Sequence, residues 1–205
     1  MEYVSVLKDI EQGNDIYIIG SGKSMDFYPK DFFKDRVTIG VNHVFDNFDV
    51  KYVVSHHHPQ CCQRAIDAGK ILITSEHDTC IMEMAKHNLV GDYYVYKHRK
   101  QGFMTTDFSA IGIPDHLIAA GTPVVTAISL AHLMGANNVF LCGVDMGMID
   151  GIINYKGYTG QTAGGHPQRS MTLIREAAVK FRQLGLGVLS IIPFTDIKLE
   201  GHTYA

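Results

Sequence analysis

The chain has 205 residues, and 18 Lys and Arg against 21 Asp and Glu give a formal net charge of −3 with His neutral. With 46% hydrophobic and 19% charged residues, the composition excludes an intrinsically disordered chain, which combines low hydrophobicity with high net charge. The sequence has no cluster of basic residues, and this argues against nucleic acid as a partner because counterion release needs several clustered Lys or Arg.

The cysteines and the chain start indicate a cytoplasmic protein. The four cysteines form no CxxC pair and no framework typical of small secreted domains; they are Cys61, Cys62, Cys80 and Cys142. Charged residues are spread among the apolar ones in residues 1–13, so we expect no signal peptide. Residues 116–144 carry no Asp, Glu, Lys or Arg, but Gly121, Pro123 and Gly135 divide them into a loop, a helix and a buried strand. We therefore expect no transmembrane segment there.

Short apolar runs rich in β-branched residues alternate with segments of helical periodicity. We expect strands at Asp15–Ile19, Val37–Val41, Tyr52–Ser55, Ile71–Thr74, Asp92–Tyr96, Asn138–Cys142 and Gly187–Ile192. Helices are expected at Ile66–Ala68, Ile81–His87, Val125–Met134 and Gln168–Leu184. This alternation predicts the α/β class, with residues 1–205 as a single doubly wound Rossmann-like domain. Its sheet is expected to be mostly parallel with helices on both faces, and ligands should bind at the carboxyl ends of the strands.

Two long segments with little periodicity interrupt this pattern. They comprise residues 97–121 and 146–167, and the second is rich in glycine. Long irregular connections in compact domains often carry function. We therefore expect both to act as lid-like loops near the active site.

The first strand runs directly into Gly20-Ser21-Gly22-Lys23-Ser24. A P-loop would need a glycine at position 17, where the chain has Tyr17, and the dinucleotide fingerprint would need one at Met25. A tight turn remains, whose amides can face a phosphate or a nucleoside. The alternative is a strand-to-helix turn without a ligand.

Polar residues also follow three other expected strands. Asn42 and His43 follow the second strand, and Asp145 follows the sixth, where it could bind a ribose, orient a base or cap a turn. After the third strand, His56 to His58 precede Pro59, and at most two of these imidazoles would converge on a metal ion, because side chains alternate in extended chain. We expect no metal there and one histidine facing the ligand.

Two helix starts carry further candidates. Thr122 with Pro123 is typical of an N-cap followed by the first helical residue, and such a start can also bind phosphate. His166 precedes the longest helix, whose positive end would lower the imidazole pKa and favour the neutral form needed in a general base. A capping or surface histidine is the alternative.

Taken together, these residues resemble a family. Gly20 to Ser24, Val41 to Phe45, His58-Pro59, Gly121-Thr122, Val139 to Asp145 and Gly165-His166 are similar, in order and spacing, to motifs of the family 42 sialyltransferases. The same motifs resemble the Maf-type flagellin glycosyltransferases and the 6-hydroxymethylpterin diphosphokinase-like proteins. Lys23 stands where these families have Pro, and Ser21 where they have Asn, so the donor and the reaction class stay open.

The resemblance implies roles for individual residues. His166 would deprotonate the acceptor hydroxyl, and Tyr155 and Tyr158 would stabilise the leaving phosphate. The expected nucleotide-binding residues are Gly20, Ser21, Gly22, Lys23, Asn42, His58, Thr122 and Asp145. The resemblance also suggests a homo-oligomer.

The leading functional hypothesis is a glycosyltransferase that moves a sugar from a nucleotide-sugar donor, first of all a CMP-sugar, to a hydroxyl acceptor such as a glycan. The reaction would invert the anomeric centre and need no metal or other cofactor. The alternative is an ATP- and Mg-dependent diphosphokinase acting on a hydroxymethylpterin-like alcohol, with Lys23 and Asp145 serving phosphate and magnesium. A third hypothesis is a non-catalytic nucleotide-binding module.

Overall fold

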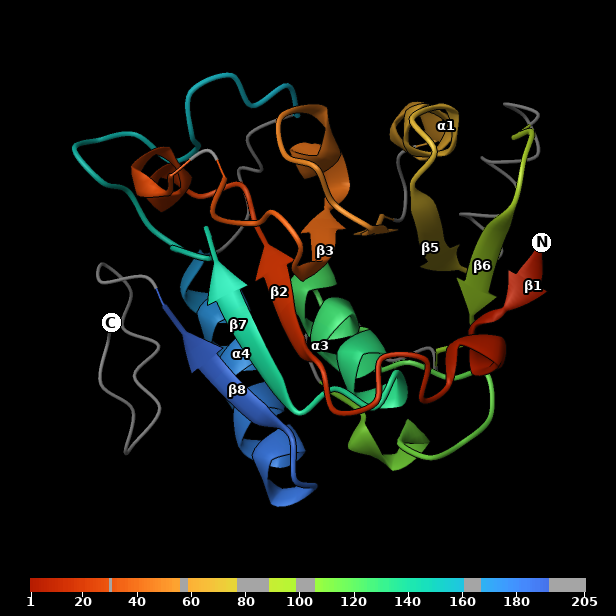
Figure 1. Ribbon diagram of the computed structural model, residues 1–205. Coiled ribbons are helices and arrows are strands. Elements are labelled where there is room, and N and C mark those ends of the chain that lie inside the picture. The colour runs from red at the N-terminus through yellow and green to blue at the C-terminus, as the bar shows by residue number, and fades with distance from the viewer. Residues whose placement is uncertain (30, 56–58, 77–88, 99–105, 161–166, 192–205) are drawn as a thin grey trace.

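In the computed structural model (Figure 1), the described residues are 1–205 without 30, 56–58, 77–88, 99–105, 161–166 and 192–205. Eight strands form one sheet in the order β1-β6-β5-β4-β3-β2-β7-β8, and every pairing is parallel. They are β1 (Glu2–Tyr3), β2 (Asp15–Ile19), β3 (Val37–Val41), β4 (Tyr52–Val54), β5 (Ile71–Ser75), β6 (Tyr93–Tyr96), β7 (Asn138–Cys142) and β8 (Gly187–Ser190). The predicted α/β fold with a parallel sheet is confirmed.

The strand predictions hold for β2, β3 and β7 to the residue, and the other expected strands differ by up to two residues at an end. β1 was not predicted, because two residues are too short to show a periodicity. The chain continues from β1 into a 3-10 helix, η1 (Val4–Leu7), which buries Val4 and Leu7. The helix expected at Ile81–His87 lies outside the described residues.

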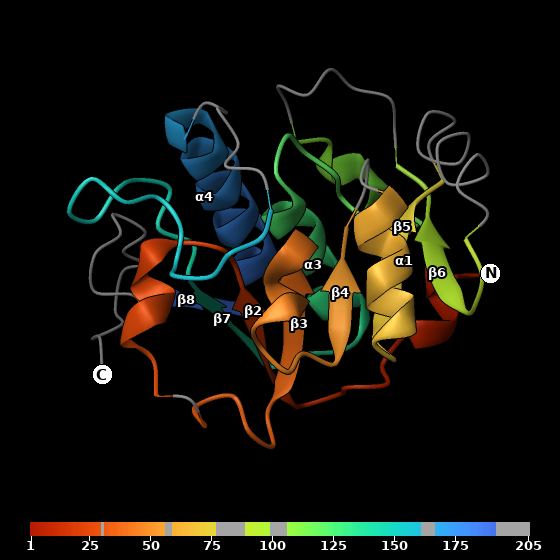
Figure 2. The same cartoon turned by 90° about the horizontal axis from the view of Figure 1, so that it is seen from above.

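Helices cover both faces of the sheet (Figures 1 and 2). α3 (Pro123–Leu133) and α4 (Pro167–Gln183) pack on one face together with the short helix η4 (Phe108–Ala110). α1 (Pro59–Asp67) and the 3-10 helices η2 (Lys23–Phe27) and η3 (Asn42–Asp46) cover the other. α1 begins seven residues before the expected Ile66. The sequence does not indicate this start, because polar residues of the exposed face separate the buried residues Cys61, Cys62 and Ala65 from a clear apolar run.

The uncharged stretch 116–144 is divided as expected. It contains α3, whose predicted N-cap Thr122 accepts a hydrogen bond from the Val124 amide at 3.4 Å, and the buried strand β7. No helix in the described part of the chain is long and apolar enough to cross a membrane. In the region expected to form the first lid, Ala110, Leu117 and Ile118 are buried in the core, so this part packs beneath α3 and α4.

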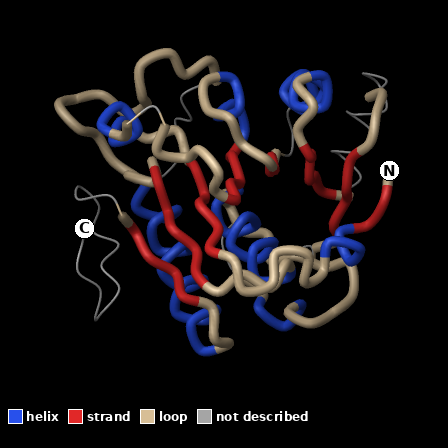
Figure 3. Tube along the Cα trace, viewed as in Figure 1, coloured by secondary structure: helices blue, strands red, loops and turns tan. Residues whose placement is uncertain are grey.

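The strand order reverses at β2. From β2 the chain adds β3, β4, β5 and β6 on one side, and then returns to place β7 and β8 on the other. Figure 3 shows the row of strands with loops and short helices gathered beyond the ends of β2, β3 and β7. In a doubly wound sheet, such a reversal leaves a crevice between the two crossovers, where ligands bind.

Candidate functional site

A cavity of about 480 Å³ lies at this reversal, at the carboxyl ends of β2, β3 and β7 and the amino-terminal end of α3. Its volume falls in the range typical of small-molecule sites. The lining consists of residues 20–22, 41–42, 121–124, 143–148, 153–154, 158 and 170.

The structure brings most of the predicted site residues together here. The cavity is lined by Gly20, Ser21, Gly22, Asn42, Thr122, Asp145 and Tyr158. Lys23 and Tyr155 are not among the residues that line it. His58 and His166 lie outside the described residues, although Ser170, in the first turn of the helix that follows His166, does line the cavity.

One wall of the cavity is built from backbone, where the turn after β2 crosses the loop after β7. The Gly20 amide donates to the Cys142 carbonyl and the Gly22 amide to the Gly143 carbonyl, both at 2.7 Å. A Cβ atom on Gly20 would lie 2.5 Å from the Gly143 oxygen, so only glycine permits this approach. Both amides therefore bond within the protein, and the contact of this turn with a nucleotide stays a prediction.

Asp145 braces the same crossing. Its carboxylate, with the residue only 6% exposed, accepts hydrogen bonds from the Ser24 amide at 2.8 Å and from the Ser24 hydroxyl. A Cβ atom on Gly22 would lie 2.5 Å from Asp145 Cγ. Burial raises the pKa of Asp145, and the two bonds from Ser24 oppose that rise. Asp145 thus holds the turn in place and also presents one edge to the cavity.

Asn42, the first residue of η3, follows the end of β3 and lines the cavity. Its φ of 54° lies in the left-handed region, which asparagine tolerates better than most residues. The Ser55 hydroxyl, at the end of the neighbouring strand β4, donates to Asn42 Oδ1 at 3.2 Å. A strained backbone held by a buried neighbour is typical of functional positions.

Lys23 points to a different partner than expected. Its ammonium group pairs with the Asp26 carboxylate within the same short helix, and its amide donates to the Ile153 carbonyl at 2.9 Å. Without a ligand, its side chain thus contributes to the helix surface, and its contact with a nucleotide stays a prediction. The sequence suggested the role because Lys follows a glycine turn, which by itself does not fix the direction of the side chain.

The two candidate tyrosines lie in different environments, one in the core and one in the wall of the cavity. Tyr155 is 4% exposed, packs edge-on against Phe48 and donates its hydroxyl to Asn47 Oδ1 at 3.2 Å, so it is a core residue. Tyr158 lines the cavity, and its burial raises the pKa of its hydroxyl against a hydrogen bond with Ser21 that lowers it. The Tyr158 hydroxyl therefore stays protonated near neutral pH and can donate a hydrogen bond to a ligand.

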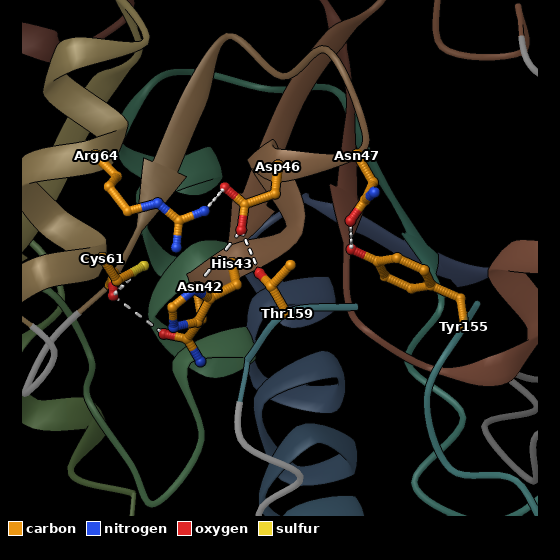
Figure 4. A network of polar contacts seen from close by, with 9 residues as sticks. Asn42, His43, Asp46, Asn47, Cys61, Arg64, Tyr155 and Thr159 are labelled. Atoms are coloured by element: carbon orange, nitrogen blue, oxygen red, sulfur yellow. Dashed lines mark hydrogen bonds and ion pairs between the residues drawn. The ribbon is translucent and has the colours of Figure 1, made fainter. Parts of the chain in front are cut away.

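A polar network lies beside the cavity, centred on Asp46 at the end of η3 (Figure 4). The Asp46 carboxylate accepts from the Arg64 guanidinium of α1 and from the Thr159 hydroxyl, and its Oδ2 lies 3.8 Å from His43 Nδ1. The next residue, Asn47, holds Tyr155. Sequence reasoning missed this network, because its members come from three separate segments.

The remaining lining is mostly apolar, and residues 146–148 and 153–154 of it fall in the glycine-rich segment that the sequence predicts as a lid. It includes Met146, Met148, Ile153 and Val144, with Asn154 and Ser170 adding polar groups. The lining, as far as the structure describes the chain, holds no Lys, Arg or His, and Asp145 is its one carboxylate. Among the same described residues, no three His, Cys, Asp or Glu side chains group as metal ligands.

Comparison with known proteins gives a likeness of fold. No protein family defined by sequence and no curated protein sequence matches the chain. The structure of a Maf glycosyltransferase from Magnetospirillum magneticum AMB-1 is similar, with a TM-score of 0.55 and 14% sequence identity over 97% of this chain and 38% of that chain. The chain thus spans less than half the length of that protein. At this identity the likeness shows a common α/β fold with a glycosyltransferase.

Proposed function

We propose that the protein is a glycosyltransferase that moves a sugar from a CMP-sugar to a hydroxyl acceptor such as a glycan, with inversion and without a metal. The observation that carries this proposal is the cavity at the strand reversal, of about 480 Å³, lined by Gly20 to Gly22, Asn42, Thr122 and Tyr158. The fold shared with a Maf glycosyltransferase supports the same class of reaction.

The charge of the lining supports a donor with a single phosphate. Triphosphates and diphosphates carry several negative charges, which proteins meet with Lys, Arg or a divalent cation. The described lining offers none of the basic residues and one carboxylate, Asp145. The one phosphodiester of a CMP-sugar can be bound by hydrogen bonds from neutral side chains, and the lining offers the hydroxyl and amide groups of Ser21, Asn42, Thr122 and Tyr158.

In the proposed reaction, His166 takes the proton of the acceptor hydroxyl, and the acceptor oxygen attacks the anomeric carbon of the donor. The bond between that carbon and the phosphate oxygen breaks, and CMP leaves with the electron pair. Tyr158 donates a hydrogen bond to the phosphate as its negative charge grows, which its raised pKa permits. Helix α4 begins at Pro167 and brings Ser170 to the cavity, which is the support for placing the base there.

The diphosphokinase hypothesis fits less well. It relied on Lys23 for phosphate and on Asp145 for magnesium, but Lys23 pairs with Asp26, and the Asp145 oxygens accept from Ser24. An ATP substrate would then meet a wall without basic side chains in the described lining. A non-catalytic nucleotide-binding module remains as the outcome if no turnover is found.

A ligand panel tests the proposal. A ligand that binds only the folded state raises the melting temperature, so purified protein is heated with CMP, CDP, UDP, GDP, ADP and ATP, each with and without magnesium. We expect stabilisation by CMP in both conditions, and stabilisation by ATP with magnesium alone would contradict it. His166→Ala should then keep CMP affinity and lower transfer by about a hundredfold or more. Unchanged CMP binding with no turnover in the unmodified protein would indicate a binding module.

A further inference from the structure

Tyr158 lies on a segment that the sheet itself does not hold. Residues 153–160, here termed the covering segment, run beside η2 and η3 over the carboxyl ends of β2 and β3 (Figure 1). Gly157 has a φ of +94°, and a Cβ atom on Gly160 would lie 2.4 Å from the Tyr158 hydroxyl oxygen. Glycines thus flank Tyr158 on both sides, and glycine gives the backbone the most conformational freedom. Contacts from outside the segment are therefore needed, beside those within it, to fix the direction of Tyr158.

The start of the covering segment is joined to the turn after β2 by backbone hydrogen bonds, among them the bond from the Tyr155 amide to the Ser21 carbonyl at 3.1 Å. Side-chain hydrogen bonds from the short helices hold the residues closer to Tyr158. The Thr159 hydroxyl donates to Asp46, and the Tyr155 hydroxyl donates to Asn47 Oδ1 at 3.2 Å (Figure 4). On the other side, the Lys156 amide donates to Asp26 Oδ1 at 2.9 Å. Tyr155, Lys156 and Thr159, on both sides of Tyr158, are thus tied to a carboxylate or an amide side chain.

Among these three side chains, Asp46 is itself held by a residue of another element, Arg64 of α1. Its side chain is only 11% exposed, so the carboxylate needs partners to replace water. Arg64 of α1 bonds to Oδ1, which leaves Oδ2 for Thr159, with His43 Nδ1 3.8 Å away. The two oxygens thus join α1 to the covering segment, one residue from Tyr158. His43 adds an edge contact to the Tyr158 ring, with ring centroids 6.3 Å apart.

We infer that Asp46 is a positioning residue, which acts through Thr159 to aim the Tyr158 hydroxyl at the ligand. The inference rests on the proposed function, because that function assigns Tyr158 a hydrogen bond to the phosphate of the donor. The anchoring itself is a property of the protein without ligand.

Amide hydrogen exchange tests the anchoring without any substrate. The amides of Tyr155, Lys156 and Tyr158 are hydrogen-bonded, so they exchange only when the covering segment opens. Thr159→Val removes the hydroxyl at nearly constant shape, and Asp46→Asn removes the charge. Both should speed exchange of these amides by about tenfold or more, while Thr159→Ser keeps the hydroxyl and should leave it slow. Unchanged exchange in both variants would overturn the inference.

A double-mutant cycle tests the link to Tyr158. Alone, Asp46→Asn and Tyr158→Phe should each lower the transfer rate kcat by about tenfold with little change in KM, and together they should lower it no further than Tyr158→Phe does. Losses that multiply would overturn the inference and assign Asp46 to general stability. Asp49→Asn is the matched control, since Asp49 follows the same helix, pairs with Lys70 at 2.6 Å and is 96% exposed.

The two readouts separate this inference from the proposed function. If the unmodified protein transfers no sugar from a CMP-sugar, the proposed function fails, and exchange alone decides whether Asp46 anchors the covering segment. If transfer occurs while exchange does not respond to Thr159→Val and Asp46→Asn, the proposed function stands and the inference is overturned.

Discussion

The two walls of the cavity are held by different forces. On the β2 and β7 side, Gly20 and Gly22 lie so close to Gly143 and Asp145 that no side chain fits between them. On the other side, the covering segment is held by hydrogen bonds alone: backbone bonds join its first residues to the turn after β2, and the side chains of Asp46, Asn47 and Asp26 hold the rest. The first wall is fixed by sterics, which tolerate no movement, and the second by bonds that break one at a time. Substitutions in the first wall should therefore lower the free energy of unfolding most, whereas substitutions in the second should mainly increase local motion of the covering segment.

Gly20→Ala should have the largest effect. The added methyl group would lie 2.5 Å from the Gly143 oxygen, a backbone atom that cannot move without separating β2 from β7. We expect a loss of about 3 kcal/mol in the free energy of unfolding, measured by urea denaturation. Gly147→Ala is the control, since its Cβ atom would meet nothing closer than 3.7 Å. Equal stability of the two variants would mean that this wall is not sterically fixed.

Asp145→Asn sharpens the comparison through pH. Because burial raises the pKa of Asp145 in the folded state, the folded protein binds this proton more tightly than the unfolded chain. The stability from this group is therefore complete below the ordinary carboxyl pKa and falls as pH rises through the raised value. Asparagine has no such dependence, so the variant should gain stability relative to the unmodified protein as pH rises from the ordinary carboxyl pKa, about 4, through the raised value, measured by urea denaturation. A relative loss would mean that the Ser24 bonds outweigh burial.

Tyr155→Phe tests the covering segment, with a smaller expected loss of stability. It removes one hydrogen bond, to Asn47, from a ring that stays packed on Phe48, so we expect a loss of about 1 kcal/mol by thermal denaturation. Sugar transfer should change much less than in Tyr158→Phe, since only Tyr158 lines the cavity. The opposite ranking would restore Tyr155 as the residue on the leaving phosphate.

Lys23→Met should have the smallest effect. Its ion pair with Asp26 lies near the surface, and such pairs contribute little, so stability should change by less than about 0.5 kcal/mol. Nucleotide affinity, measured by calorimetry, should not change. A large loss of ATP affinity in the presence of magnesium would revive the diphosphokinase hypothesis.

How much the sequence predicts differs between the same two walls. β2, β3 and β7 could be placed to the residue, because each is an apolar run ended by polar residues or glycine, and their ends predict where Gly20, Asn42 and Asp145 meet. The covering segment could not be placed in this way. Tyr155 and Tyr158 stand three residues apart in an irregular loop, and their directions depend on distant partners, such as Asn47, which bonds Tyr155, and Asp46, which bonds Thr159. Strand patterning is local, whereas these contacts join residues about 110 positions apart.

The pairing of β2 with β7 also bears on how the protein folds. Asp15 lies opposite Asn138, 123 residues later, so β2 gains its second neighbour late in chain order, before β8 is added. Strands β2 to β6 are all made before β7 exists, and until β7 arrives one edge of β2 stays unpaired. Closing so long a loop is slow, and contacts of this separation lengthen folding times. Residues after β2 and after β7 line the cavity together, so a ligand would bind only once these strands have paired, and its binding would draw the equilibrium toward the folded state.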